Sequence, residues 1–185
     1  MDHHICPWQH GAFLTSPVRK LSNDPIRITK DYATAGATVM DVGCGMGFFT
    51  VPMARLVGPS GLVIAVDVQE QMLAGMQKNA AKAGCSNITP HLCNSHSLEI
   101  TQWDGTVDFA VVFHMLHEAP DPQGLIGEVF TALKPGGALL FAEPILHVGK
   151  QEFEQEATLF ANAGFVETTR PHIGISRAIV WRKPR

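Results

Sequence analysis

The amino-acid sequence predicts a doubly wound α/β domain built on a mostly parallel sheet. Short apolar segments alternate with segments of helical periodicity along most of the 185 residues. Two of the apolar segments have an aspartate as their next-to-last residue, and the last two segments are joined by a linker too short to hold a helix. Parallel strands need crossover connections and bury both sheet faces, which produces continuous apolar runs of this kind. The pattern therefore favours an α/β sheet with one antiparallel pair.

The first half of the chain repeats a strand–turn–helix unit. Residues 37–42 (ATVMDV) are expected to form a strand, and a GCGMG turn leads into a helix over 48–58. A second strand is expected over 61–68 (GLVIAVDV), followed by a helix over 70–84 that closes at a glycine, as helix C-termini often do. Two consecutive units of this type predict two neighbouring parallel strands.

The second half continues the alternation and then changes character. The linker PHIGI between the last two apolar segments is too short for a crossover helix, so these two strands should pair antiparallel at one edge of the sheet. The expected elements are strands over 87–93, 107–114 and 137–144, helices over 122–133 and 151–164, and final strands over 165–170 and 176–183.

Composition and charge place limits on function. The chain is 45% hydrophobic and 17% charged, so it is globular, and its length suits one domain. We expect residues 1–30, which hold three prolines, to form an N-terminal arm or lid packed on the core, and residues 31–185 to form the domain itself. Fourteen Lys and Arg against seventeen Asp and Glu give a net charge of -3, which argues against a nucleic-acid-binding surface.

The N-terminus and the cysteines suggest a compartment. The first residues lack the basic segment and apolar core of a signal peptide, and no apolar run approaches the roughly 18 residues of a membrane span. The four cysteines are scattered without a CxxC pair, which predicts reduced thiols rather than disulfides or a metal site. We therefore expect a cytoplasmic protein without a membrane partner.

The turn between Asp41 and Gly47 is the strongest candidate for a ligand site. Gly43, Gly45 and Gly47 follow the first strand, and ligands of doubly wound sheets bind beyond the carboxyl ends of the strands. The second strand ends at Asp67, where a carboxylate can accept hydrogen bonds from both hydroxyls of a ribose. Together the two features predict a site for a nucleoside-containing cofactor.

The spacing of the glycines argues against a dinucleotide. A dinucleotide site uses G-x-G-x-x-G, but here the spacing is G-x-G-x-G and position 48 is Phe. Asp41, two residues before the turn, suits a cationic ammonium group better than a pyrophosphate. An NAD-dependent oxidoreductase is therefore the less favoured interpretation.

Four segments in order resemble the motifs of the class I S-adenosylmethionine-dependent methyltransferases, especially small bacterial and archaeal members with an HEAPD-like segment. These segments are DVGCGMG, VIAVDV, DFAVVFHMLHE and LKPGGALLFAEP, and the resemblance covers residues 31–183. It implies the Rossmann-like methyltransferase fold, with seven strands of which the last is antiparallel. It also implies transfer of a methyl group from S-adenosyl-L-methionine to an acceptor. No large insertion is present to recognise a macromolecule, so a small-molecule acceptor is expected.

The resemblance also implies roles for individual residues. The three glycines would line the methionine portion of the cofactor, with Asp41 near its amino group and Asp67 on its ribose. Where the family usually has an aspartate for the adenine amino group, this chain reads Cys93-Asn94-Ser95, and the carbonyl of Asn94 can accept the same hydrogen bond. The complete cofactor-binding set that we predict is Asp41, Gly43, Cys44, Gly45, Gly47, Asp67, Val68, Gln69, Met72, Asn94, Ser95, Phe113 and His114.

The segment FHMLHEAPD, at the end of the fourth strand, supplies the candidate catalytic residues His117, His114 and Glu118. Methyl transfer needs a base only if the acceptor must lose a proton. A metal site is the least favoured interpretation, because H-x-x-H-E differs from the HExxH order and lacks an evident third ligand. Two interpretations stay open: His117 and Glu118 cap the following helix or bond the backbone, or they face the substrate. Glu143, at the end of the fifth strand, and His147, which follows it, are expected to lie at the same edge of the sheet as His117.

Two further questions stay open at this level. The chain is either a monomer or a homodimer, since nothing in the sequence decides between them. A protein that binds the cofactor as a sensor or as a subunit of a complex, without catalysis, would keep the same cofactor motifs.

Overall fold

The computed structural model describes residues 23–185. Most of the predicted N-terminal arm, residues 1–22, lies outside the described residues. Within the described part of that arm, α3 (Pro25–Thr29) is a short helix whose N-cap, Asp24, accepts a hydrogen bond from the backbone N–H of Ile26 at 3.0 Å. Among residues 23–185, every helix is too short or too polar to cross a membrane.

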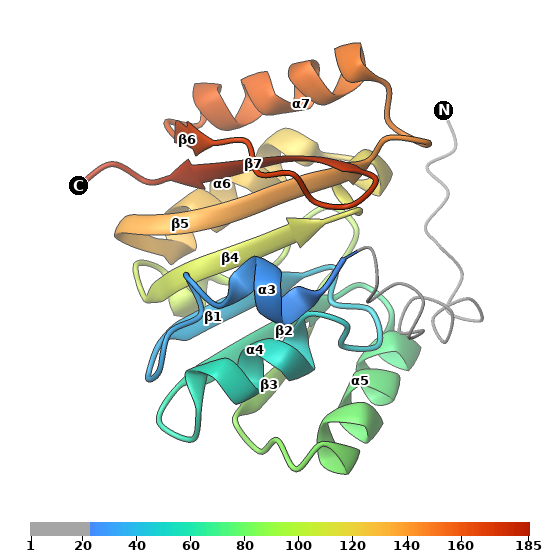
Figure 1. Cartoon of the computed structure of the whole chain (residues 1–185), viewed down its shortest axis with the longest axis vertical. Helices are drawn as coiled ribbons and strands as arrows, with labels where there is room; N and C mark the ends of the chain where they lie inside the picture. Colours follow the sequence, from blue (N-terminus) through green and yellow to red (C-terminus); the bar gives the residue numbers. More distant parts are fainter. Residues whose placement is uncertain (1–22) are drawn as a thin grey trace. The chain divides into compact units, whose positions relative to one another are not determined.

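Seven strands form one sheet in the order β3-β2-β1-β4-β5-β7-β6 (Figure 1). The pairs β1–β2, β2–β3 and β4–β5 are parallel, whereas β7 is antiparallel to both β5 and β6. The predicted doubly wound sheet with an antiparallel last strand is confirmed. The strands are β1 (Thr38–Val42), β2 (Leu62–Asp67), β3 (Ile88–Leu92), β4 (Val107–Phe113), β5 (Leu133–Pro144), β6 (Val166–Thr169) and β7 (Ser176–Arg182).

The predicted helices are present, most of them shorter by a residue or two at their ends. They are α4 (Thr50–Val57), α5 (Glu70–Lys82), α6 (Pro122–Ala132) and α7 (Lys150–Asn162). Two short 3-10 turns, η2 (Thr101–Trp103) and η3 (Leu116–Glu118), were not expected from the sequence. The second of these turns holds His117, so it bears directly on the candidate site.

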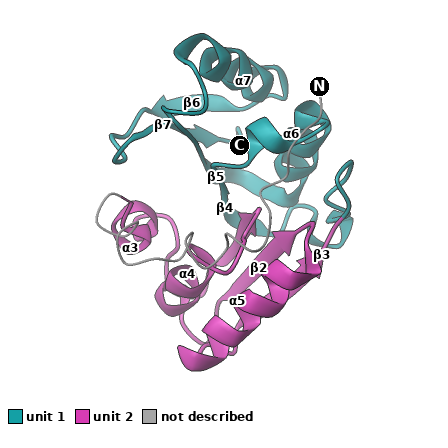
Figure 2. Cartoon of the chain, turned by 90° about the vertical axis from the view of Figure 1, so that its right-hand side faces the viewer, with its two compact units in different colours: residues 1–4, 94–185 teal, residues 5–93 magenta. Residues whose placement is uncertain are grey.

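The described residues divide into two compact units, an N-terminal unit over 23–93 and a C-terminal unit over 94–185 (Figure 2). In the N-terminal unit, strand β2 and helix α5 pack around a cluster of small and flexible apolar side chains. This cluster consists of Cys44, Ala65, Leu73, Met76 and Ala80. The glycine turn is therefore backed by a packed core.

The core of the C-terminal unit is aromatic. Phe141 of β5 packs against both Phe153 and Phe160 of α7, with ring centroids 5.1 and 4.7 Å away. Trp181 of β7 stacks on Phe160 at 5.5 Å. Rings at such separations add attraction to their large buried area, so they anchor α7 to the end of the sheet that carries the antiparallel strand.

Strand β5 begins earlier than the sequence predicts. We expected it to start after KPGG at residue 137, yet it runs from Leu133 through this segment. Val107 pairs with Leu133 and Phe109 with Ala138, so the KPGG residues form a bulge opposite β4. The backbone N–H of Gly136 donates to Lys183 at 2.9 Å, which keeps the bulge paired on its other side.

Candidate active site

The glycine turn has the backbone geometry that only glycine adopts easily. Gly43, Gly45 and Gly47 have φ values of 71°, 52° and 89°. A Cβ at Gly47 would lie 2.9 Å from Cγ of Met76, so this glycine is also required for packing. A Cβ at Gly45 would meet nothing within 4 Å, so the space beside that residue is open to a ligand.

Asp67 ties the end of β2 to the glycine turn. Its Oδ2 accepts from the N–H of Gly45 at 2.8 Å and its Oδ1 from the N–H of Gln69 at 2.9 Å. Burial raises the pKa of this carboxyl group, while the backbone N–H donors of Gln69 and Gly45 oppose the rise. A carboxylate offers about four acceptor positions, so Asp67 keeps capacity for ribose hydroxyls.

Asp41 and Cys44 are both buried in the same unit. Asp41 accepts a hydrogen bond from the hydroxyl of Thr50 at 2.5 Å, which fixes the carboxylate beside the first turn of α4. Burial raises the pKa of the Cys44 thiol well above its usual value, and the nearby charges of Asp41 and Asp67 add to the rise. The thiol therefore stays protonated, and Cys44 is a packing residue of the turn rather than a nucleophile.

Asn79 supports the glycine turn and was missed by the sequence analysis. Its side-chain N–H donates to the carbonyl of Met46 at 2.9 Å, so helix α5 holds the middle of the turn. A Cβ at Gly75 would lie 3.0 Å from Cγ of Met46, so glycine at this helix position makes room for the turn. The available signal was a Gly and an Asn inside one helix, since both residues have low helix propensity.

The residues after β2 differ in exposure. Val68 is 36% exposed. Leu92, the last residue of β3, pairs with Asp67 and is 50% exposed. Exposed aliphatic side chains at the ends of neighbouring strands suit the flat face of an adenine, and Leu92 was not anticipated. Met72 is only 3% exposed and contributes to the core, so its predicted cofactor contact has no exposed surface to support it.

Asn94 already uses the acceptor that we assigned to adenine. Its Oδ1 accepts from the N–H groups of His96 at 2.8 Å and Ser97 at 2.9 Å, and its amide donates to Glu99 at 3.0 Å. A carbonyl oxygen has two lone pairs, so Asn94 would have to release one of these bonds to hold an adenine amino group. Ser95 is exposed in the same turn.

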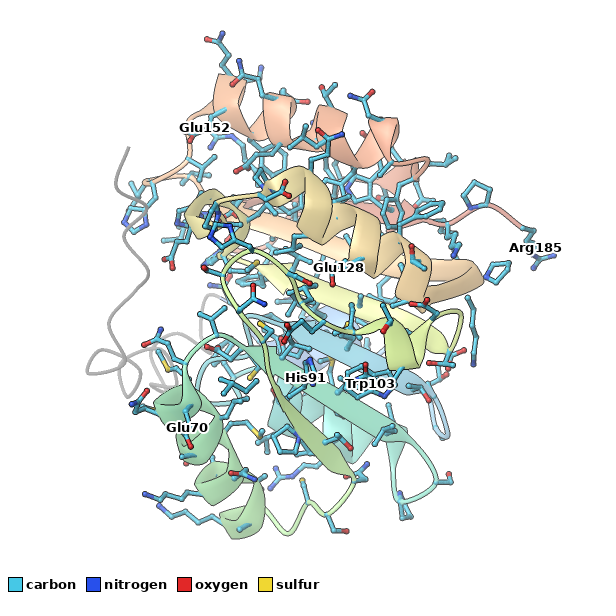
Figure 3. The ribbon with its side chains drawn as sticks, turned by 180° about the vertical axis from the view of Figure 1, so that it is seen from behind. Glu70, His91, Trp103, Glu128, Glu152 and Arg185 are labelled. Atoms are coloured by element: carbon cyan, nitrogen blue, oxygen red, sulfur yellow. The ribbon has the colours of Figure 1, made fainter. Side chains whose placement is uncertain are left out.

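The loop that carries Asn94 is anchored to helix α6. The carboxylate of Glu128, labelled in Figure 3, accepts from the N–H groups of Leu98 at 3.1 Å and Glu99 at 3.0 Å. Glu99 has a φ of 54°, a left-handed conformation that is uncommon for a residue with a side chain. Glu128 therefore stabilises a strained loop, and this role had no signature in the sequence.

His114 leaves β4 in an unusual conformation. Its φ is 60°, and its backbone N–H donates to the carbonyl of Ala142 at 2.8 Å. The ring stacks on Phe113, with centroids 4.1 Å apart, and its Nε2 is 2.8 Å from the hydroxyl of Ser176. Both the backbone and the ring of His114 are thus held in place, and its contact with the cofactor stays a prediction.

His117 and Glu143 form a close pair. Nδ1 of His117 is 2.7 Å from Oε2 of Glu143, whose side chain is 1% exposed. The other oxygen of Glu143 accepts from the backbone N–H groups of Leu116 at 2.9 Å and His117 at 3.3 Å. A buried carboxylate therefore fixes both the 3-10 turn and the imidazole ring that it carries.

This pairing gives His117 the properties of an oriented base. The hydrogen bond to Glu143 raises the pKa of His117, and burial opposes the rise. With Nδ1 bound to the carboxylate, the remaining nitrogen, Nε2, can accept a proton. Nε2 lies 3.9 Å from Glu118, which is too far for a hydrogen bond, so Glu118 acts on it by charge alone.

The structure tests the interpretation that His117 and Glu118 of FHMLHEAPD cap the following helix. Helix α6 is capped by Asp121, whose side chain accepts from the N–H of Gly124 at 2.9 Å, so capping by His117 or Glu118 was wrong. The backbone of the turn is bonded by Glu143 rather than by His117. Among residues 23–185, no group of three or more His, Cys, Asp or Glu side chains is arranged to hold a metal ion.

Glu156 of α7 adds a third acidic group to this neighbourhood. Burial, together with the charges of Glu143 and Glu152, raises its pKa to about 8, and His117 opposes the rise. Its Oε2 is buried without a hydrogen-bond partner among the described residues. At neutral pH the folded chain therefore keeps Glu156 mostly protonated.

Glu156→Gln is expected to stabilise the protein in alkaline solution. The unfolded chain releases this proton near pH 4.5, whereas the folded chain holds it until about pH 8, so wild-type stability falls as pH rises across that range. After allowance for solvent screening, the variant should gain about 1–2 kcal/mol at pH 8.5 and almost nothing at pH 4. Urea unfolding at both pH values measures this, with the exposed Glu70→Gln as the control. An equal effect at both pH values would contradict the prediction.

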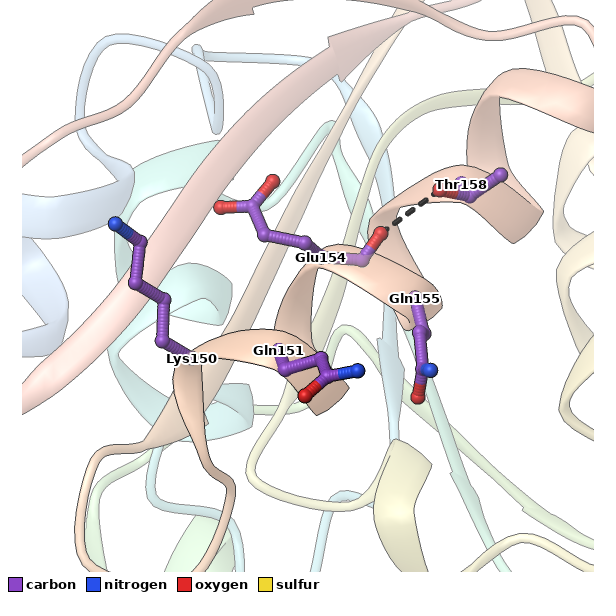
Figure 4. Close-up of a pocket in the computed structure, with 5 residues that line it drawn as sticks. All are labelled: Lys150, Gln151, Glu154, Gln155 and Thr158. Atoms are coloured by element: carbon purple, nitrogen blue, oxygen red, sulfur yellow. Dashed lines mark hydrogen bonds between the residues drawn. The ribbon is translucent and has the colours of Figure 1, made fainter.

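A separate hollow lies along α7 (Figure 4). It is lined by Lys150, Gln151, Glu154, Gln155 and Thr158, and the hydroxyl of Thr158 donates to the carbonyl of Glu154 at 2.8 Å. All five residues come from one helix, and Glu154 is already paired with Arg170 at 2.6 Å. None of the predicted site residues lines this hollow.

Comparison with known proteins agrees with this geometry. A family model described as a methyltransferase domain matches residues 33–174. Demethylmenaquinone methyltransferase of Shouchella clausii is 32% identical over 120 residues, which cover 63% of this chain and 50% of the relative. The ubiquinone/menaquinone biosynthesis C-methyltransferase UbiE of Pasteurella multocida is 36% identical over 115 residues, covering 60% and 42%. The matched part of the chain thus spans about half the length of these curated relatives.

The fold has a similar counterpart among solved structures. A SAM-dependent methyltransferase from Aquifex aeolicus superposes with a TM-score of 0.86 at 24% identity, covering 96% of this chain and 99% of that one. This likeness supports the seven-stranded sheet. Because the family model spans well over half of the chain, the protein belongs to the methyltransferase-domain family, with the fold of the class I S-adenosylmethionine-dependent methyltransferases.

Proposed function

We propose that this protein transfers a methyl group from S-adenosylmethionine to a small-molecule acceptor, with His117 as the general base. The observation that carries the proposal is the 2.7 Å contact between His117 Nδ1 and the buried Glu143. A base is useful to a methyltransferase whose acceptor must lose a proton, and it must be held in the correct tautomer to act. The names of the two curated relatives, which concern quinone compounds, support a small-molecule acceptor.

The residues of the N-terminal unit fit the cofactor. Asp67 retains acceptor capacity for ribose hydroxyls, Gly45 borders open space, and Val68 and Leu92 present exposed aliphatic surface. Asp41 would offer a negative charge to an ammonium group. When bound, S-adenosylmethionine supplies a methyl group on a positively charged sulfur, which needs no further activation as a leaving group.

The residues of the C-terminal unit would handle the proton of the acceptor. Glu143 holds Nδ1 of His117, so Nε2 receives the proton and the imidazolium that forms is stabilised by the carboxylate. Glu118, 3.9 Å from Nε2, would further stabilise the positive charge. Ser176 holds the ring of His114, which we place at the cofactor rather than in the proton transfer.

Calorimetry and a product assay test this proposal. S-adenosylmethionine and S-adenosylhomocysteine should both release heat on binding, and incubation with phenols, thiols and amines should yield S-adenosylhomocysteine with at least one acceptor class. Binding without turnover by any acceptor would favour a cofactor sensor instead. Absence of heat with both compounds, alongside tight binding of NADH, would favour an oxidoreductase. A cytoplasmic location and the choice between monomer and homodimer remain predictions.

A further inference from the structure

Two neighbouring loops of the C-terminal unit carry three exposed aliphatic side chains. Ile145 and Leu146 follow β5 and are 43% and 79% exposed, and Ile175 precedes β7 and is 52% exposed. The backbone N–H of Ile145 donates to the carbonyl of Ile175 at 3.0 Å, so the two loops are tied together. We call Ile145, Leu146 and Ile175 the apolar rim.

The residues of the apolar rim neighbour, along the chain, the residues that hold the two histidines. Glu143, which orients His117, lies two residues before Ile145, and Ser176, which holds His114, directly follows Ile175. Pro144 and Ser176 pair across β5 and β7, which fixes the starting points of both loops. Beyond Leu146, the ring of His147 lies 6.3 Å from the ring of His117.

Exposure of this kind is costly unless something covers it. Burying one Leu or Ile side chain contributes about 1.5–3 kcal/mol, and clustered exposed apolar residues mark binding surfaces. Three side chains fall far short of the roughly 800 Å² per partner of a stable protein interface. The rim therefore suits part of a small ligand better than a second protein.

The base beside the rim limits the chemistry of that ligand. An imidazole held by a buried carboxylate, as His117 is held by Glu143 at 2.7 Å, is a useful base for hydroxyl groups that titrate near pH 10, such as a phenol. It is a poor base for an aliphatic alcohol, whose proton is held far more tightly. Among hydroxyl compounds, a ligand that serves both the rim and His117 thus combines an apolar body with an acidic hydroxyl.

We propose that the apolar rim binds the apolar portion of the methyl acceptor, and that this acceptor is a hydrophobic phenol whose hydroxyl faces Nε2 of His117. This inference rests on the proposed methyl transfer and narrows its substrate. The hydroxyl proton passes to His117, and the phenol oxygen forms a bond to the methyl carbon. The carbon–sulfur bond breaks and leaves its electron pair on sulfur, so the products are an aryl methyl ether, S-adenosylhomocysteine and one proton.

Matched probe compounds and matched variants test the inference. The probes are 4-hexylphenol, 4-hexylbenzyl alcohol, which keeps the apolar body but lacks an acidic hydroxyl, and 4-hydroxybenzamide, which keeps the phenol but lacks the apolar chain. The wild-type protein should methylate 4-hexylphenol with the lowest KM and should leave the benzyl alcohol unchanged. In Leu146→Ser/Ile175→Ser, the KM for 4-hexylphenol should rise about tenfold or more, with kcat within about twofold. The control Val166→Ser, 55% exposed on β6, should leave both constants unchanged.

Direct binding separates this inference from the proposed function. Calorimetry with 4-hexylphenol, in the presence of S-adenosylhomocysteine, should show binding that the double variant loses. Equal affinity in the wild type and the double variant would contradict the binding of the acceptor by the apolar rim, even if methyl transfer occurs. Rim-dependent binding without methyl transfer would instead overturn the acceptor role. A dimer that the double variant dissociates, with no probe binding to the wild type, would assign the rim to contact between copies of the chain.

Discussion

Asp67→Ala is expected to weaken the binding of S-adenosylhomocysteine about 100-fold or more. The carboxylate would accept hydrogen bonds from two ribose hydroxyls, and a hydrogen bond to a charged group contributes about 1.5–3 kcal/mol. Two bonds at the lower end of that range amount to about 3 kcal/mol, or about two factors of ten in affinity. The substitution also releases the N–H of Gly45, which Asp67 holds at 2.8 Å, so the glycine turn loses its tie to β2.

Calorimetry with S-adenosylhomocysteine measures this effect. Asp31→Ala, which removes an exposed carboxylate from the same unit, serves as the control and should bind as the wild type does. A thermal unfolding curve for Asp67→Ala shows whether the variant is folded at the temperature of the titration. An unchanged dissociation constant in a folded Asp67→Ala would remove this residue from the cofactor site.

Glu143→Gln is expected to lower kcat about 100-fold or more, with little change in cofactor affinity. The amide keeps the shape of the buried side chain but removes the charge that stabilises a protonated His117. General base catalysis by a positioned side chain raises the reaction rate about 10²–10⁴-fold. A base whose partner is lost or altered loses much of this rate enhancement. His117→Gln should show a loss of similar size, because the two residues act as one unit.

The pH profile separates a catalytic pair from a merely structural one. Activity requires neutral His117, so the acidic limb of kcat in the wild type should lie above pH 6.5, where Glu143 has raised the pKa. In Glu143→Gln this limb should move to lower pH. The stability that the pair contributes is complete below about pH 6.5 and is lost as pH rises through the raised pKa, because the folded state then releases its extra proton.

Glu154→Gln is the matched control for this experiment. Glu154 pairs with Arg170 on the surface of the same unit, and its replacement should leave both kcat and the pH profile unchanged. If Glu143→Gln loses activity only in proportion to its folded fraction, with the acidic limb in place, then Glu143 only supports the loop.

The sheet and the glycine turn that follows its first strand were accessible from the sequence because both depend on local patterns. The continuous apolar runs from 37 to 42 and from 61 to 68 require strands buried on both faces, and the position of Asp67 follows from where the second run ends. The short linker before Ser176 likewise left an antiparallel pair as the simple solution. These predictions required only the direction of each strand and the residue at which it ends. They did not require distances between side chains.

The rest of the site depends on contacts between distant residues. Glu143 meets His117 across 26 residues, and its identity as a partner follows from the register of β4 against β5, which includes the KPGG bulge. Asn94 was assigned to adenine by its type, although its own turn takes up both acceptor positions of its carbonyl. Glu156 reads as an ordinary charged residue on the amphipathic helix α7, and only its burial beside Glu143 and Glu152 shows that it stays protonated.

The link between β6 and β7 makes the protein a candidate for substrate exchange by loop grafting. Residues 170–175 join two strands of the C-terminal unit, end in Ile175, and contain none of the residues that we assign to the cofactor. The loop is fixed at its C-terminal end, because Ser176 pairs with Pro144 across the sheet. A library that varies this loop alone would sample acceptor shapes while the residues from Asp41 to Gln69 stay untouched. The antiparallel strand β7 would then stay unchanged, while the loop before it determines which acceptor the protein binds.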